Sequence, residues 1–296
     1  MMGDVAIVVT DSGLGGLSVC AGLERQARVS GHGARTSLTY VNAWPEEGRG
    51  YNDYPDMAAR ASVFDRALEA IASLTPERLL IACNTLSILY PLTAFSRRAP
   101  FPVLGIIEAG VSVFLDALGR DPTSSIVLLG TRTTIAADVH RRALIAAGVD
   151  PGRIAAVSCH GLAAAIERDV RGSRVDELIA ACAADVARAR PAGTSVLIGL
   201  CCTHYAYVAG RLGASVGRAI VKPVHPLDPN ARLVADAGGM WSGTVPLGGQ
   251  RPGRVDVISK VVLDVPARDG VAALIRPVSA ATADAVRLYR HVPALF

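Results

Sequence analysis

Short apolar runs alternate along the chain with longer segments in which apolar residues recur at helical spacing. Strands separated by helices of this length pair in parallel, because the helix carries the chain back to the same end of the sheet. Strands are predicted at 5–9, 37–41, 78–82, 103–107, 125–129, 154–157, 195–200 and 255–258. Helices are predicted at 56–73, 110–118, 135–147, 175–190 and 279–289. The pattern therefore predicts an α/β protein with mainly parallel sheets.

Two segments in the last third of the chain fit neither the strand nor the helix pattern. A turn is expected at 225–230, where two prolines bracket Leu227 and Asp228, with a helix starting at Ala231. The segment 238–254 is rich in glycine and proline, which indicates a loop or a lid.

Three of the predicted strands end in polar or thiol side chains. Cys83-Asn84-Thr85 follows the third strand, and Cys202-Thr203-His204 follows the seventh. The first strand runs into Asp11-Ser12 and a glycine-rich turn. Ligands of open α/β sheets bind outside the carboxyl ends of the strands. We therefore expect these side chains to line a ligand site.

The order of these motifs resembles that of a known family. D-S-G-x-G-G at 11–16, C-N-T at 83–85 and C-T-H at 202–204 are joined by G-I-I-E at 105–108, by G-T-x-x-T at 130–134 and by C-H-G at 159–161 with Glu167 after it. Over residues 5–236 the chain is similar to the aspartate/glutamate racemase superfamily, most closely to the glutamate racemase type, which works without pyridoxal phosphate. The resemblance implies two similar lobes with the active site in the cleft between them: 1–104 with 225–296, and 105–224.

Racemisation needs a base on one face of the α-carbon and an acid on the other. A thiolate is a good base near neutrality once positive charge or hydrogen-bond donors lower its pKa. By resemblance, Cys83 and Cys202 alternate in these roles. Asp11 would assist Cys83, and Glu167 and His204 would assist Cys202, as acid–base groups within hydrogen-bond reach.

Other polar residues of the motifs are expected to hold the substrate. Hydroxyls and amides there can bind its charged groups and neutralise charge as the carbanion forms. This set is Ser12, Asn84, Thr85, Thr131, Thr134 and Thr203. The loop after the second strand departs from the Pro-Tyr-Gly turn of glutamate racemases, and it brings Tyr51 and Asn52 into the same set. Arg132 adds a positive charge that can hold a distal carboxylate, or it faces solvent at a helix start.

The remaining cysteines have simpler interpretations. Cys20, Cys159 and Cys182 are expected to be small buried hydrophobic residues with reduced thiols. Cys201 should point to the face opposite Cys202, since side chains alternate along a strand. Cys201-Cys202-x-His204 lacks the spacing of a zinc site, so no metal is expected.

Composition changes this picture little. Hydrophobic residues make up 51% of 296 residues, yet no run reaches the roughly 18 apolar residues of a membrane helix. The net charge of +4 is dispersed, unlike a nucleic-acid surface. The turn at 13–18 lacks the third glycine of a dinucleotide fingerprint. We expect a cytoplasmic protein that binds neither membranes nor nucleic acids and needs no cofactor; the resemblance leaves a homodimer open.

The sequence thus predicts a cofactor-independent racemase or epimerase of an amino acid, with glutamate or aspartate as the first candidates. Alternatives within the superfamily are a decarboxylase, a cis-trans isomerase or a hydantoin-type racemase. A catalytically silent protein that binds a small acid is the alternative outside enzymology.

Overall fold

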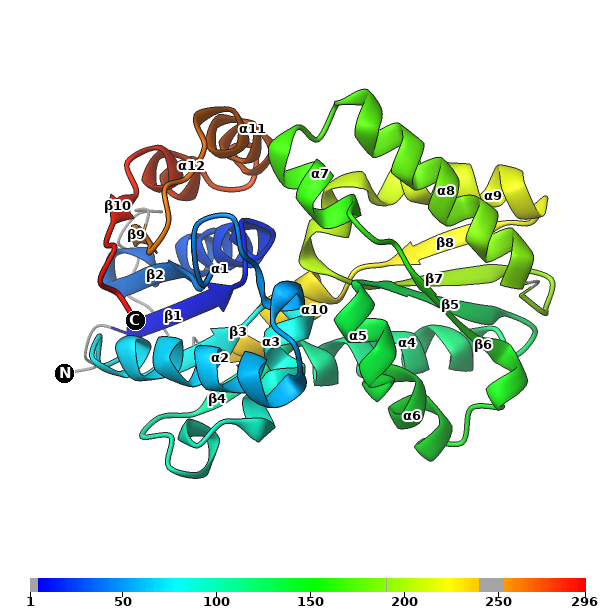
Figure 1. The fold of residues 1–296 in the computed structure, drawn as a ribbon, viewed down its shortest axis with the longest axis horizontal. Coiled ribbons are helices and arrows are strands. Elements are labelled where there is room, and N and C mark those ends of the chain that lie inside the picture. Colours follow the sequence, from blue (N-terminus) through cyan, green and yellow to red (C-terminus); the bar gives the residue numbers. More distant parts are fainter. Residues whose placement is uncertain (1–4, 190, 240–252) are drawn as a thin grey trace. The chain divides into compact units, whose positions relative to one another are not determined.

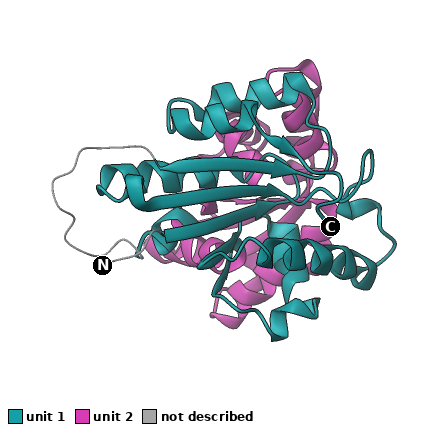
Figure 2. Ribbon diagram, turned by 90° about the vertical axis from the view of Figure 1, so that its left-hand side faces the viewer, with its two compact units in different colours: residues 1–106, 233–296 teal, residues 107–232 magenta. Residues whose placement is uncertain are grey.

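The computed structural model describes residues 5–189, 191–239 and 253–296 (Figure 1). They form two compact units, drawn in teal and magenta in Figure 2. Unit 1 comprises Met1–Ile106 and Leu233–Phe296, and unit 2 comprises Ile107–Arg232. Most of the segment predicted as a loop or lid, 240–252, lies outside the described residues.

Unit 1 is built on a six-stranded sheet whose strands are all parallel, in the order β10-β9-β2-β1-β3-β4. Its strands are β1 (Val5–Asp11), β2 (Thr36–Asn42), β3 (Arg78–Ile81), β4 (Val103–Gly105), β9 (Arg254–Ser259) and β10 (Arg290–His291). Its α-helices are α1 (Leu17–Val29), α2 (Met57–Ala72), α3 (Asn84–Leu89), α11 (Val265–Ile275) and α12 (Ala280–Arg287). Short 3-10 turns are η1 (Gly33–Arg35), η2 (Tyr51–Asp53), η3 (Tyr90–Leu92) and η4 (Phe95–Arg97).

The strands of unit 1 are apolar on both faces because helices cover both. Val8, Val41 and Ile81 pack with Phe64 and Leu68 of α2 on one side. Their neighbours along the strands point the other way and are also buried. Continuous apolar runs are typical of such parallel strands. The register pairs Asp11 with Asn42, so β1 and β2 end at the same edge.

Unit 2 repeats this plan with a four-stranded parallel sheet in the order β6-β5-β7-β8. Its strands are β5 (Ser125–Gly130), β6 (Ile154–Ser158), β7 (Val196–Cys201) and β8 (Val224–Leu227). Its helices are α5 (Arg132–Ala137), α6 (Val139–Ala146), α7 (Leu162–Arg168), α8 (Ser173–Ala189) and α9 (Ala209–Ile220), with 3-10 turns η5 (Pro151–Arg153) and η6 (Thr203–Val208). The helices α4 (Ile106–Arg120) and α10 (Pro229–Gly238) span the boundaries between the units.

Alternate residues of the strands of unit 2 enter two separate cores. Val127 and Ile198 pack beneath α7, α8 and α9, whereas Ile126 and Leu197 pack against α4 and α6 (Figure 1). Cys202 joins the first core and Cys201 the second. The predicted alternation of these two cysteines is therefore confirmed.

The predicted α/β class with helix-flanked parallel sheets is confirmed, but several boundaries differ. The fourth strand ends at Gly105, and α4 already begins at Ile106. The helix predicted at 135–147 is broken at Asp138, whose backbone is left-handed with φ 56°. The turn predicted at 225–230 is partly the strand β8, which includes Pro226. Proline is tolerated there because β8 lies at the edge of its sheet.

The helices formed by the described residues include none that is both long and apolar enough to cross a membrane.

Candidate active site

In unit 1 the thiol of Cys83 lies beside the residues that follow β1. Cys83 comes after β3 and is the N-cap of α3. The Oγ of Ser12 is 3.2 Å from its Sγ, and the Ser12 N–H donates to Oδ1 of Asp11 at 2.6 Å. Both Asp11 and Cys83 are buried. The ends of two neighbouring strands thus bring a thiol, a hydroxyl and a carboxylate together.

Gly16 makes this close arrangement possible. A Cβ at Gly16 would lie 2.9 Å from both Cβ and Oδ2 of Asp11, and 3.0 Å from Cβ of Ala82. A larger residue would push the carboxylate of Asp11 out of place. The last glycine of the D-S-G-x-G-G motif, Gly16, therefore has a packing reason.

The surroundings of Cys83 favour its protonated form. Burial raises the pKa of the Cys83 thiol well above its ordinary value, and the charge of Asp11 raises it further. Hydrogen bonds from the hydroxyl of Ser12 and from the backbone N–H groups of Leu86 and Ser12 oppose this shift. Such a thiol can supply a proton, and the opposing donors can hold the thiolate that remains.

Two side chains near Cys83 have buried polar atoms without a partner among the described residues. They are both polar atoms of the Asn84 amide and the hydroxyl of Tyr51. Thr85 is also buried, whereas Asn52 is exposed. Buried polar groups are normally hydrogen-bonded. The hydrogen-bonding capacity of these atoms is therefore not used by the described residues.

In unit 2 the thiol of Cys202 belongs to a chain of three groups. Cys202 follows β7 and is the N-cap of η6. Its Sγ lies 3.9 Å from Nδ1 of His204, and Nε2 of His204 lies 2.6 Å from Oε2 of Glu167. Glu167 is carried by α7, 37 positions earlier in the chain. The structure thus brings together the three residues that the sequence assigned to this side.

The surroundings of His204 favour the protonated form of its imidazole. Burial alone lowers the pKa of His204, but hydrogen bonds to Cys202 and Glu167 and the negative charges of both raise it well above its ordinary value. His204 therefore favours the imidazolium form. A positively charged hydrogen-bond donor thus lies beside the Sγ of Cys202.

The predicted substrate-binding residues of unit 2 are placed as follows. Thr131 is the N-cap of α5, and its Oγ1 accepts from the Thr134 N–H at 3.3 Å and lies 3.0 Å from the Thr134 hydroxyl. Thr134 and Thr203 are buried. Arg132 is exposed at the first residue of α5, the orientation that the sequence left as an alternative.

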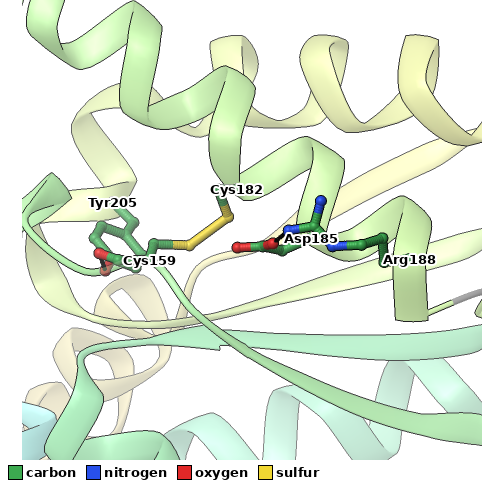
Figure 3. The surroundings of a disulfide bond; sticks show 5 residues. All are labelled: Cys159, Cys182, Asp185, Arg188 and Tyr205. Atoms are coloured by element: carbon green, nitrogen blue, oxygen red, sulfur yellow. Dashed lines mark hydrogen bonds and ion pairs between the residues drawn. A yellow bond between two sulfur atoms is a disulfide. The ribbon is translucent and has the colours of Figure 1, made fainter.

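One expectation about the other cysteines is wrong. Cys159 and Cys182 form a disulfide with a Cα–Cα distance of 5.5 Å, although reduced thiols were expected (Figure 3). Both are buried as expected, but Cys159 at the end of β6 faces Cys182 of α8. Cys20 and Cys201 are free and buried, and burial raises the pKa of Cys20 to about 12.

Tyr205 is a residue of this site that the sequence analysis missed. Its ring is fully buried, and its hydroxyl donates to the Cys159 carbonyl at 3.1 Å. It ties the turn that carries Cys202 and His204 to the turn that precedes α7. Its position directly after the C-T-H motif was the available signal.

Comparison with known proteins gives one consistent picture. The family model described as Asp/Glu/Hydantoin racemase matches residues 7–227. A glutamate racemase of Brucella canis is 31% identical over 225 residues, which are 75% of each chain. A crystal structure of a glutamate racemase isoform from Bacillus anthracis has a TM-score of 0.70 at 19% identity, covering 92% of this chain and 93% of the other. One from Francisella tularensis in complex with D-glutamate has a TM-score of 0.69 at 17% identity, covering 92% and 94%.

Proposed function

The chain belongs to the Asp/Glu/Hydantoin racemase family and is an isomerase of the racemase kind, and we propose that Cys83 and Cys202 are its two catalytic thiols. In this proposal it interconverts the enantiomers of an amino acid without a cofactor. The observation that carries the proposal is that each unit sets one buried thiol at the end of a parallel strand beside a carboxylate-linked partner: Ser12 and Asp11 in one, His204 and Glu167 in the other.

The proposed reaction begins with Cys202 as thiolate and Cys83 as thiol. Cys202 takes the α-proton, and the electron pair left on the α-carbon is stabilised by the substrate carboxylate and the hydrogen-bond donors around it. Cys83 then delivers its proton to the opposite face of the same carbon. The product leaves Cys202 protonated and Cys83 as thiolate, which is the starting state for the other enantiomer. No proton or electron is consumed over the two turnovers.

The partners of the thiols have defined tasks in this scheme. The imidazolium of His204 supports the Cys202 thiolate, and Glu167 fixes the orientation of the ring and stabilises its positive charge. The Ser12 hydroxyl accepts from the Cys83 thiol and donates to the thiolate once the proton has left, while Asp11 orients the turn through the Ser12 N–H. The unpartnered amide of Asn84 is available to the substrate's carboxylate or ammonium group.

Glutamate and aspartate are the first candidate substrates. The relatives from Brucella canis and Francisella tularensis are glutamate racemases, which supports glutamate. The departure of the 42–52 loop from the Pro-Tyr-Gly turn widens the choice to other small carboxylated amino acids. A cytoplasmic location, the absence of a nucleic-acid or membrane partner and a homodimer stay predictions.

Proton exchange in heavy water tests the proposal. Purified protein is incubated with single D- and L-amino acids in D2O, and deuterium at the α-carbon is followed by NMR together with optical rotation. The proposal expects α-deuteration and loss of rotation for at least one acid. A change in an alkene or release of carbon dioxide without α-deuteration would show an isomerase or a decarboxylase instead. Binding with neither reaction would show a silent binding protein.

Cofactor independence has its own readout. Activity should survive dialysis against EDTA and treatment with carbonyl reagents, because thiols alone carry the protons. Loss of activity with EDTA, restored by zinc, would contradict the proposal. Alkylating reagents should inactivate, and substrate should protect.

A further inference from the structure

Tyr51 carries a buried hydroxyl with no hydrogen-bond partner in the described part of the chain. The residue is 2% exposed, and its ring packs edge-on against Phe64 with the ring centroids 6.3 Å apart. A buried hydroxyl in this state has lost its hydrogen bonds to water and gained none. Few such groups occur in native proteins, and each needs an explanation. A bound ligand supplies one.

The hydroxyl lies in the surroundings of the proposed catalytic thiol. Tyr51 and Cys83 belong to the same buried cluster of unit 1. Burial raises the pKa of Tyr51 well above its ordinary value, and the charge of Cys83 raises it further. The phenol therefore stays protonated and can donate a hydrogen bond. The amide of Asn84, which follows Cys83 directly, has unpartnered polar atoms as well.

The loop around Tyr51 fixes the position of the ring. The Gly50 N–H donates to Oδ2 of Asp53 at 2.7 Å, and the Trp44 ring lies so close that a Cβ at Gly50 would be 2.7 Å from its Cη2. The Tyr54 hydroxyl donates to Oε1 of Glu46 at 2.9 Å. Because the loop is braced on both sides of Tyr51, the phenol is held in the core rather than turned to solvent. A fixed donor binds an acceptor without first losing rotamer freedom.

We propose that Tyr51 determines substrate specificity by donating a hydrogen bond from its hydroxyl to an acceptor in the substrate side chain. Ser12 and Asn84 already supply groups for the reacting centre, and Tyr51 comes from the segment in which the chain departs from the racemase pattern. The substrates selected are amino acids with a side-chain carboxylate or amide. Those with an alkyl side chain of equal length leave the phenol unpaired and are rejected. This inference rests on the proposed racemase function.

Tyr51→Phe tests the inference because it removes only the oxygen. The matched control is Tyr54→Phe on the same loop, whose hydroxyl has a protein partner in Glu46. α-Deuteration rates are measured for glutamate against norvaline and for aspartate against 2-aminobutyrate. For the preferred acid, kcat/KM should fall about ten- to a hundredfold in Tyr51→Phe, the usual effect of one hydrogen bond to a charged group. The rate with its alkyl counterpart should stay within a fewfold.

The melting temperature of the free protein gives a second readout. It should be unchanged or higher in Tyr51→Phe, because an unpaired buried oxygen is removed, and lower in Tyr54→Phe, which loses a bond to Glu46. Tyr54→Phe should keep the selectivity of the wild type. Equal losses on both members of a pair in Tyr51→Phe, or no loss, would overturn the inference. A large drop in its melting temperature would do the same.

Failure of the racemase proposal gives a different result. If the wild type deuterates none of the four acids, the proposed function fails on this panel. The Tyr51 inference is then decided by ligand-induced stabilisation. Excess glutarate or succinate should raise the melting temperature of the wild type more than that of Tyr51→Phe. Equal shifts, or none in the wild type, would reject it.

Discussion

Cys83 and Cys202 have the same local setting but different partners. Each follows a buried parallel strand and caps the helical turn after it. Behind Cys83 lie a hydroxyl and a carboxylate, and burial with negative charge raises the pKa of its thiol. Behind Cys202 lies the imidazole of His204, whose pKa is raised by its hydrogen bonds to Cys202 and Glu167 despite its burial.

The difference shows that two similar sheets can surround the same functional group with partners of opposite charge. The surroundings of Cys83 favour the neutral thiol, and those of Cys202 place the imidazolium of His204 beside its sulfur. A racemase needs one thiol in each state at the start of every turnover. We therefore interpret the unlike partners as the means by which the free enzyme holds its single catalytic proton on a defined side.

Replacement of either thiol should have the largest effect. Cys83→Ser and Cys202→Ser should each lower the racemisation rate roughly a thousandfold or more, since a serine hydroxyl is too weakly acidic to replace a catalytic acid–base group. Elimination from an amino acid with a β-leaving group needs only one base. It should survive in one variant for each enantiomer, and the surviving enantiomer should switch between the two variants.

Racemisation at the wild-type rate in Cys83→Ser would exclude the two-base mechanism. Elimination lost equally in both variants for both enantiomers would show that the two thiols do not act on separate faces.

The disulfide lies in unit 2, which also carries Cys202, and it should stabilise the folded state of that unit. Cys159 and Cys182 are 23 positions apart, and closing a loop of this length stabilises a protein by about 3 kcal/mol in the chain-entropy model. Alkylation of the denatured, unreduced protein should label four of the six cysteines, and all six after reduction. Urea denaturation should show a lower free energy of unfolding for Cys182→Ala. Cys20→Ala, which replaces a free cysteine, is the control. Six labelled cysteines before reduction would show that the bond does not form.

Glu167→Gln should slow proton transfer by Cys202 without removing its thiol. We expect the racemisation rate to fall about ten- to a hundredfold, because a general acid–base group keeps its place but loses a charged partner. The two enantiomers have equal free energies, so kcat/KM must fall equally in both directions. The asymmetry should appear instead in the α-deuterium isotope effect, which should rise for the enantiomer whose proton Cys202 removes. An equal rise for both enantiomers would contradict the separation of the two sides.

The pH profile of the same variant has a defined sign. The pKa of His204 is raised in the folded protein, so its imidazolium is present below that pKa and is lost as the pH rises through it. Glu167→Gln removes one of the interactions that raise this pKa. The alkaline limb of the rate profile should therefore move to lower pH. A limb that stays in place would show that it reports another group.

The sequence predicted what depends on local pattern and missed what depends on tertiary contact. The apolar runs before Cys83 and Cys202 located their strands, because buried parallel strands are apolar on both faces. Pro226 indicated a turn, yet it lies in the strand β8. A strand can contain proline at the edge of a sheet, and the sequence does not show that β8 is an edge strand. The helical spacing across Asp138 hid the break there. The pairing of Cys159 with Cys182 and the inward orientation of Tyr51 depend on packing between separate elements, which spacing does not encode.

The smallest effect is expected at Cys201, the neighbour of Cys202. Its side chain points into the core on the opposite face of the sheet, and its Sγ lies 3.6 Å from the Gly199 carbonyl oxygen. Burial raises the pKa of Cys201, so this thiol stays protonated. A serine hydroxyl can keep the contact with Gly199, at a stability cost of about 1 kcal/mol for burying a more polar group. Racemisation by Cys201→Ser should therefore stay within about twofold of the wild type, as for a substitution that spares the acid–base groups. A loss approaching that of Cys202→Ser, at unchanged melting temperature, would mean that the strand β7 presents the other thiol to the substrate.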